Sequence, residues 1–249
     1  MLLEIERAAV SGRLSPFSAC VSAGERIHLL GPNGAGKSSL LARLSGLLPG
    51  VGRVQFLGQP LENWSGKQLA RLRAWLPQQQ PPLGQMAVFH YLQLHLVDEA
   101  PQDESTLQTI LHCLQLKDKL SRRLTHLSGG EWQRVRLAAA LLQIGSGPVA
   151  KGKLLLLDEP MSGLDVAQQA AVDDLLAPLS ANGVAVIMSG HDLNHSLHQA
   201  QRVWLMKAGQ VVAQGAVEEV MQPELLQQVY EVPFRKLCVE GHNMLTVWR

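Results

Sequence analysis

The 249-residue sequence lacks features that define several classes of protein. It has three cysteines, which are scattered and odd in number: Cys20, Cys113 and Cys238. We therefore expect reduced, mostly buried thiols rather than a disulfide framework or a metal cluster. The 22 basic residues nearly balance the 21 acidic ones, and this net charge of +1 indicates neither a nucleic-acid partner nor an anionic membrane surface.

Long apolar runs and signal-peptide features are also missing. No run approaches the roughly 18 residues that a membrane-spanning helix needs. The N-terminal MLLEIERAAV carries acidic residues where a signal peptide carries basic ones. We expect a soluble chain that reaches a membrane only through a partner, and its 46% hydrophobic share is ample for a packed core.

What the sequence does contain is an alternation of strand-like and helical segments. Short apolar runs predict strands at 26–30 and 53–57, at 73–77, and within 153–160 and 183–190. The region from 88 to 143 is helical in pattern throughout. This order predicts an α/β core that is interrupted by an all-helical insertion.

Local signals predict some boundaries of these elements. Ser65 is placed to cap a helix between two of the strands, and Pro178 should end or kink a helix over 166–179. A late hairpin should turn at Ala208 and Gly209.

The strongest motif is GPNGAGKS, which follows a predicted strand directly and opens a predicted helix. The glycines Gly31, Gly34 and Gly36 let the backbone curl so that its N–H groups face a β-phosphate. Lys37 brings a positive charge to the β- and γ-phosphate oxygens, and the Ser38 hydroxyl can bind Mg²⁺. The motif predicts binding of a nucleoside triphosphate.

The run LLLLDEP places two carboxylates at the end of a buried strand. Asp158 at the strand tip can hold a water bound to Mg²⁺, and Glu159 can orient and deprotonate an attacking water. An Asp-Glu pair after a strand is often only the start of a solvated loop, but together with the phosphate loop it favours hydrolysis.

A second phosphate-binding helix tip lies in LSGGEWQRVRLAAALL, where adjacent glycines expose backbone N–H groups at the positive end of a helix. The domain thus has two phosphate-binding helix tips but only one phosphate-loop lysine and one carboxylate pair. The simplest explanation is that two copies of the chain meet across a two-fold interface and that each nucleotide site is built from both copies. Inside this helix, Arg134 and Arg136 either orient the helix or only keep it soluble.

GPNGAGKSS, LSGGEWQRVRLA, LLLLDEPMSGLD and MSGHD, in this order, resemble the ATP-binding subunits of ABC transporters. The resemblance implies an α/β P-loop NTPase (RecA-like) core with an antiparallel β subdomain and an inserted α-helical subdomain. It implies one ABC ATP-binding domain over 1–249, in which 1–77 and 144–249 form the core and 78–143 the helical subdomain that carries the signature motif.

The resemblance also implies the cofactors ATP and Mg²⁺ and a role for each motif residue. Glu159, His191 and Gln78 are the implied catalytic residues; Gln78 is chosen over Gln79 and Gln80 because it directly follows the strand-ending Leu-Pro. The implied Mg²⁺ ligands, partly through water, are Ser38, Gln78 and Asp158. The implied nucleotide contacts are Gly31, Pro32, Asn33, Gly34, Ala35, Gly36, Lys37, Ser38 and Ser39.

The implied partners begin with a second copy of the chain. Its ATP would be covered by the signature residues Ser128, Gly129, Gly130 and Glu131, and Asp165 would be the D-loop residue that meets this copy. The further implied partners are a transmembrane permease dimer and, indirectly, a periplasmic substrate-binding protein. The implied location is the cytoplasmic face of the bacterial inner membrane.

Among ABC proteins the chain resembles the metal-chelate importers, and its runs FLGQPLENWS, LPQQQPP and SGHDLNHSLHQA are most similar to the ATPases of vitamin B12 importers. The alternatives are the ATPase of an iron-siderophore or haem importer and a soluble, non-transporting ABC ATPase. A soluble ABC ATPase of DNA repair would carry a long coiled-coil insertion, for which the interval between the phosphate loop and LSGGE is too short.

Two features leave alternatives open. The family stacks adenine on an aromatic residue before the phosphate loop, but Phe17 has the pattern of a core residue. Arg13 or Leu14 could cover the base instead, so the choice between ATP and GTP stays open. His191, His195 and His198 share one helix face at metal-ligand spacing, although surface or partly buried polar roles are favoured for the last two.

Overall fold

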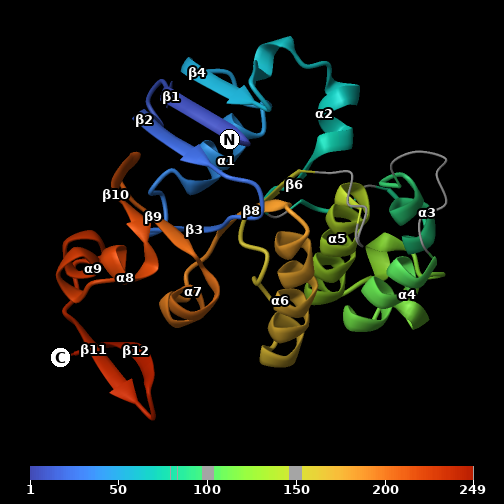
Figure 1. The fold of residues 1–249 in the computed structure, drawn as a ribbon. Helices are drawn as coiled ribbons and strands as arrows, with labels where there is room; N and C mark the ends of the chain where they lie inside the picture. Colours follow the sequence, from blue (N-terminus) through green and yellow to red (C-terminus); the bar gives the residue numbers. More distant parts are fainter. Residues whose placement is uncertain (79, 83, 97–103, 146–152, 249) are drawn as a thin grey trace.

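The computed structural model describes residues 1–78, 80–82, 84–96, 104–145 and 153–248. A four-stranded sheet lies above a six-stranded sheet in Figure 1, and a group of helices lies to the right of both. A two-stranded hairpin carries the C-terminal end. Within the described ranges, none of the helices combines the length and the apolar character needed to span a bilayer.

The four-stranded sheet is antiparallel, in the order β2-β1-β4-β5. Its strands carry both buried and exposed side chains, because one face packs on the core and the other meets solvent, and shifts of register along β1 interrupt a strict alternation. The bounds are β1 Leu3–Val10, β2 Leu14–Val21, β4 Val51–Phe56 and β5 Gln59–Pro60.

The six-stranded sheet has the order β10-β9-β3-β8-β7-β6. All neighbours are parallel except the β9–β10 hairpin. Parallel strands end at the same edge, so the loops after β3, β7 and β8 come together there. The bounds are β3 Arg26–Leu30, β6 Arg73–Leu76, β7 Leu154–Leu157, β8 Ala185–Ser189, β9 Arg202–Lys207 and β10 Gln210–Ala216.

Helices cover the sheets and fill the insertion. Helices α5 and α6 lie below the central strands in Figure 1, with α3 and α4 beyond α5. The bounds are α1 Lys37–Leu44, α2 Gly66–Leu72, α3 Val88–Gln93, α4 Glu104–Cys113, α5 Gly129–Ile144, α6 Val166–Ala181, α7 Leu193–Gln199, α8 Val217–Val220 and α9 Pro223–Tyr230. Short 3₁₀ turns lie at Leu61–Asn63, Lys117–Lys119 and Leu124–His126, and the C-terminal hairpin is β11 Phe234–Val239 and β12 His242–Val247.

The four leucines of β7 show why the central sheet is stable. Alternate side chains of a strand point to opposite faces. Leu154 and Leu156 therefore join the hydrophobic cluster under the antiparallel sheet, whereas Leu155 and Leu157 join the cluster formed with α5 and α6. An uninterrupted apolar run is thus what a parallel strand covered on both faces requires.

The predicted elements agree with the structure in most places. The strands, the hairpin turn at Ala208–Gly209 and the helical region are confirmed within the described residues, and Ser65 caps α2 through a capping box with Gln68. Helix α6, however, continues three residues past Pro178 to Ala181. The proline lies in the last turn, where the remaining backbone groups can still be satisfied: Asn182, the C-cap residue, donates its N–H to the Pro178 carbonyl.

The expectation of mostly buried cysteines is wrong. Cys20 and Cys238 are exposed, Cys113 is half-buried, and all three are free thiols. Cys20 lies on β2, an edge strand of the antiparallel sheet, and Cys238 lies on the C-terminal hairpin, so neither is covered by a second layer.

Candidate nucleotide-binding and hydrolysis site

The phosphate loop joins β3 to α1 and depends on glycine at its first position. Gly31 has a φ of +151°, and a Cβ placed there would lie 2.2 Å from the Met206 carbonyl oxygen on β9. No side chain fits at that distance, so the close packing of the loop on β9 requires glycine. The loop is therefore held against the sheet before any ligand binds.

Lys37 begins α1 and is 6% exposed. Its Nζ donates to the Gly31 carbonyl at 2.7 Å and to the Pro32 carbonyl at 3.1 Å, so the lysine braces the loop from inside. Burial lowers the pKa of Lys37, and the nearby carboxylates of Glu159 and Asp158 oppose this shift. The ammonium group therefore lies between the loop and the carboxylate pair.

Asp158 and Glu159 follow β7, as predicted, and one serine connects them to the next strand. Ser189 at the end of β8 donates its hydroxyl proton to Asp158 Oδ1 at 2.6 Å and accepts the Glu159 N–H at 2.9 Å. Glu159 has a left-handed backbone with φ of +50°, which is costly for a residue with a side chain. Ser189 was not predicted from the sequence, although a polar residue at the end of the apolar run AVIMS was a signal for it.

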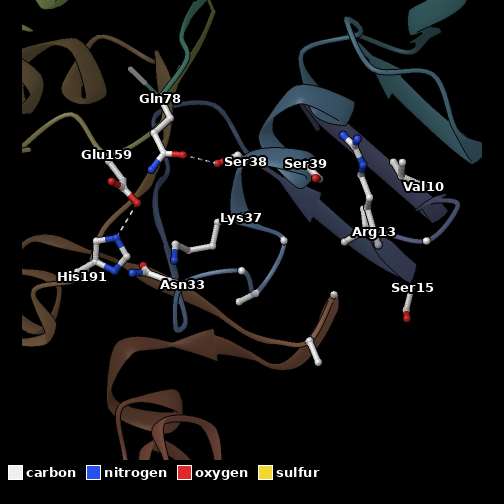
Figure 2. A pocket seen from close by; sticks show the side chains of 17 residues that line it. Val10, Arg13, Ser15, Asn33, Lys37, Ser38, Ser39, Gln78, Glu159 and His191 are labelled. Carbon is white, nitrogen blue, oxygen red and sulfur yellow. Dashed lines mark hydrogen bonds and ion pairs between the residues drawn. The ribbon is translucent and has the colours of Figure 1, made fainter. Parts of the chain in front are cut away.

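Glu159 and His191 come together from neighbouring strands. His191 Nε2 lies 2.6 Å from Glu159 Oε1, and both side chains face the space beside Lys37 in Figure 2. On the opposite side, the Ser38 hydroxyl lies within 3.4 Å of Gln78 Oε1. Of the neighbouring glutamines, Gln79 lies outside the described residues.

A single cavity of about 680 Å³ connects these groups. Glu159, His191 and Gln78 lie at one end, and Arg13, Val10 and Ser15 lie at the other (Figure 2). Between them the floor is formed by the loop and the start of α1, namely Asn33, Gly34, Ala35, Gly36, Lys37, Ser38 and Ser39. The cavity also includes Leu14, so both residues suggested for the adenine end are present; Phe17 is buried against Trp204 in the core, as its pattern indicated.

The signature residues lie at the start of α5, outside this cavity. The Ser128 hydroxyl accepts the Glu131 N–H, and the Glu131 carboxylate accepts the Ser128 N–H at 2.8 Å. This reciprocal capping lowers the pKa of Glu131, with further contributions from nearby Lys119 and Arg122. The Glu131 carboxylate is thus engaged in capping its own helix, while Gly129 and Gly130 line an adjoining cavity of about 550 Å³ that shares Gln78 and Glu159 with the first.

Asp165 and the histidines of α7 have separate local partners. Asp165 is exposed and caps α6, because its Oδ1 accepts the Gln168 N–H at 2.8 Å. His195 Nε2 lies 2.9 Å from Asp173 Oδ2 on α6, whereas His198 is exposed. The three histidines of the MSGHD segment and α7 therefore do not converge, and among the described residues no cluster has the donors for a metal site.

The two arginines of α5 are not there for solubility. Arg134 and Arg136 are 7% and 4% exposed, so that alternative is wrong. Both donate hydrogen bonds to groups on neighbouring segments, as the orienting role requires.

A glycine-rich loop between a parallel strand and a helix, with an acidic pair at the tip of a neighbouring strand, defines a P-loop NTPase. Residues 14–162 match the family model described as ABC transporter, and the chain belongs to this family. The structure of an "ATP binding subunit of ABC transporter" superposes with a TM-score of 0.80 at 26% identity, covering 93% of this chain and 98% of that one. A nucleotide-free ATP-binding cassette shares the fold with a TM-score of 0.71 at 24% identity, over 93% of this chain and 96% of the other.

Among curated proteins, the chain is 52% identical to the vitamin B12 import ATP-binding protein BtuD of Escherichia coli O139:H28 (strain E24377A / ETEC). The same identity is found with the protein of that name from Shigella boydii serotype 18 (strain CDC 3083-94 / BS512). Each match spans 245 residues and 98% of both chains. The similarity therefore extends well beyond the segment that the family model covers.

Proposed function

We propose that the chain is the ATP-binding and ATP-hydrolysing subunit of a vitamin B12 importer. The full-length similarity to vitamin B12 import ATP-binding proteins supports the substrate. The contact between Glu159 and His191 beside Lys37 supports the reaction. This contact carries the proposal, because a carboxylate held at the γ-phosphate end of the loop has a purpose only if a water is to be activated there.

Three residues that line the cavity, together with Ser189 behind them, have definite parts in hydrolysis. Lys37 exchanges its bonds with the loop carbonyls for the β- and γ-phosphate oxygens. Glu159 orients the attacking water and accepts its proton. His191 holds the Glu159 carboxylate from one side, and Ser189 holds its backbone, so that the general base is in position before the nucleotide arrives.

The oxygen donors near the loop are suited to Mg²⁺. The Ser38 hydroxyl, the Gln78 amide oxygen and the Asp158 carboxylate are hard ligands of the kind that Mg²⁺ prefers. When bound there with ATP, Mg²⁺ neutralises charge on the phosphate oxygens. Gln78 also begins the segment that leads to the helical part, so it is placed to report on the membrane partner.

The active form is a pair of chains with shared sites. The signature tip at Ser128, Gly129 and Gly130 is outside the Lys37 cavity of its own chain, and we infer that it closes over ATP held by the second copy. Asp165 lies at that interface. ATP then joins the two chains, and hydrolysis lets them part, which moves an attached transmembrane permease dimer. The chain works at the cytoplasmic face of the bacterial inner membrane, and a periplasmic binding protein delivers the substrate.

Reconstitution in liposomes tests this function. The chain should assemble with a vitamin B12 permease dimer and drive ATP-dependent uptake of cyanocobalamin, whereas Glu159→Gln should bind ATP and trap a dimer but lose turnover by at least about 100-fold. A parallel arm uses an iron-siderophore permease. Uptake in that arm alone would assign the chain to iron-siderophore import, and full turnover by a single Glu159→Gln chain would refute the general-base role.

A further inference from the structure

Arg136 is a buried arginine that makes no salt bridge with a carboxylate in the described part of the chain, and the nearby Asp158 offsets only part of the lowering of its pKa by burial. Its Nη1 donates to Gln133 Oε1 at 3.0 Å, and its Nη2 donates to the Pro77 carbonyl oxygen. Burying a guanidinium costs several kcal/mol before its hydrogen bonds are counted, and an apolar side chain of similar volume is often as stable. We therefore expect Arg136 to contribute less to stability than to the relative position of α5 and the segment at Pro77, which its hydrogen bonds connect.

Gln133, one helical turn earlier, continues the connection to the catalytic turn. Its Nε2 donates to the Pro160 carbonyl at 3.0 Å and to the Glu159 carbonyl at 3.3 Å. Its Oε1 accepts from Arg136, so both ends of the amide are engaged. A continuous hydrogen-bonded bridge thus runs from Pro77 through Arg136 and Gln133 to the backbone that carries Glu159.

A third side chain of α5 holds the far side of the Gln78 segment. Trp132 Nε1 donates to the Gln80 carbonyl oxygen at 2.6 Å. Side chains of α5 therefore hydrogen-bond to the backbone on both sides of Gln78, at Pro77 and at Gln80. The same short stretch of one helix, residues 132–136, contacts both segments that place the implied catalytic residues.

We propose that Gln133 and Arg136 are positioning residues that make α5 a rigid link between the signature tip and the catalytic residues of the same chain. The inference rests on the proposed function, in which the tip of α5 closes over the ATP of the second copy. Closure then presses α5 against the backbone of Gln78 and Glu159. Each chain thereby aligns its own hydrolytic residues only when its partner holds ATP.

The two side chains hydrogen-bond to backbone carbonyls and to each other, and neither hydrogen-bonds to the carboxylate of Asp158 or Glu159. Loss of the bridge should therefore lower kcat, while ATP binding to the isolated chain and KM change little. Arg134 supplies a matched control, since it is also buried in α5. It donates to the Leu114 carbonyl and to Gln115 Oε1, both at 3.1 Å, and so bonds only within the helical part.

The experiment compares Arg136→Met, Gln133→Met, the double variant and Arg134→Met, each reconstituted with the permease dimer. Arg136→Met and Gln133→Met should each lower kcat about tenfold, because misplacement of a catalytic group by a fraction of an ångström is enough. The double variant should lose no more than either single variant, since both break one bridge. Arg134→Met should keep kcat within about twofold of the unaltered protein at a similar loss of thermal stability.

Arg136→Lys tests for rescue. Lysine keeps the positive charge but has one ammonium group in place of the planar guanidinium, so this variant should recover part of the turnover that Arg136→Met loses. The bridge is refuted if Arg136→Met matches Arg134→Met in kcat, or if the two single losses multiply in the double variant. Should Arg136→Met fail to fold, Gln133→Met tests the same bridge from its other end with a neutral side chain of similar size. An unaltered protein that binds ATP without hydrolysing it would instead contradict the proposed function itself.

Discussion

His28 gives the protein a stability that depends on pH, and its size follows from the structure. The residue lies on β3 and is 4% exposed. The Ser196 hydroxyl donates its one proton to the Asp192 carbonyl, so it must accept from His28 Nδ1, 2.9 Å away. The neutral ring therefore carries its proton on Nδ1. A second proton, on Nε2, would place a charge in the core beside the stacked ring of His195, 5.5 Å away.

Burial lowers the pKa of His28 from 6.5 to about 3, with smaller contributions from His195 and Arg26. The unfolded chain takes up this proton near pH 6.5, but the folded chain does not until about pH 3. The contribution of neutral His28 to the free energy of unfolding is therefore fully present above pH 6.5. It is lost progressively as the pH falls from 6.5 towards 3. Between pH 7 and pH 5 the loss from this one group is about 2 kcal/mol.

Urea denaturation at pH 7 and pH 5 measures the effect. His28→Asn keeps an N–H donor close to the position of Nδ1 but cannot titrate, so the difference between the two pH values should shrink by about 2 kcal/mol relative to the unaltered protein. The control is His112→Asn, an exposed histidine on α4, which should leave the difference unchanged. Equal pH dependence in His28→Asn and the unaltered protein would show that His28 is not held neutral by the fold.

Three further substitutions test the phosphate loop and the signature tip. Lys37→Ala should lose nucleotide affinity by at least about tenfold in titration calorimetry, and unchanged affinity would reject the loop as the phosphate site. Ser128→Arg should leave ATP binding to the isolated chain intact yet abolish turnover and ATP-driven dimerisation; turnover at the normal rate would show that the tip covers no partner nucleotide. Gly31→Ala should destabilise the fold by about 2–3 kcal/mol, because its Cβ would meet the Met206 carbonyl, whereas Gly66→Ala has open space and should be neutral or stabilising; equal thermal stability of the two would refute the packing argument.

Much of the fold was predictable because its signals are local. A buried parallel strand needs a run of apolar residues, and LLLL before Asp158 supplies one. A helix start needs a capping side chain, and Ser65, Ser128 and Asp165 each have a glutamine or glutamate three residues later that completes a capping box. These are properties of neighbouring residues, so they can be read without the tertiary structure.

The C-terminal end could not be predicted in this way. The hairpin β11–β12 is short and largely exposed, and it has a weak apolar pattern. Its position depends on Leu245, which is buried and whose backbone exchanges two hydrogen bonds with the Asn194 side chain on α7. Only the folded chain shows that this end packs against the helix that follows the His191 loop.

By itself, the sequence determined the family of this protein and the places of its candidate site residues, because each of them lies in a contiguous motif whose local conformation brings it to a strand tip or a helix start. The tertiary structure alone decided how those motifs are held. Ser189 reaches the carboxylate pair from 30 residues away, and the His28–Ser196 bond joins residues 168 apart. A buried polar side chain needs a partner, and which distant segment supplies it depends on packing that no local pattern encodes.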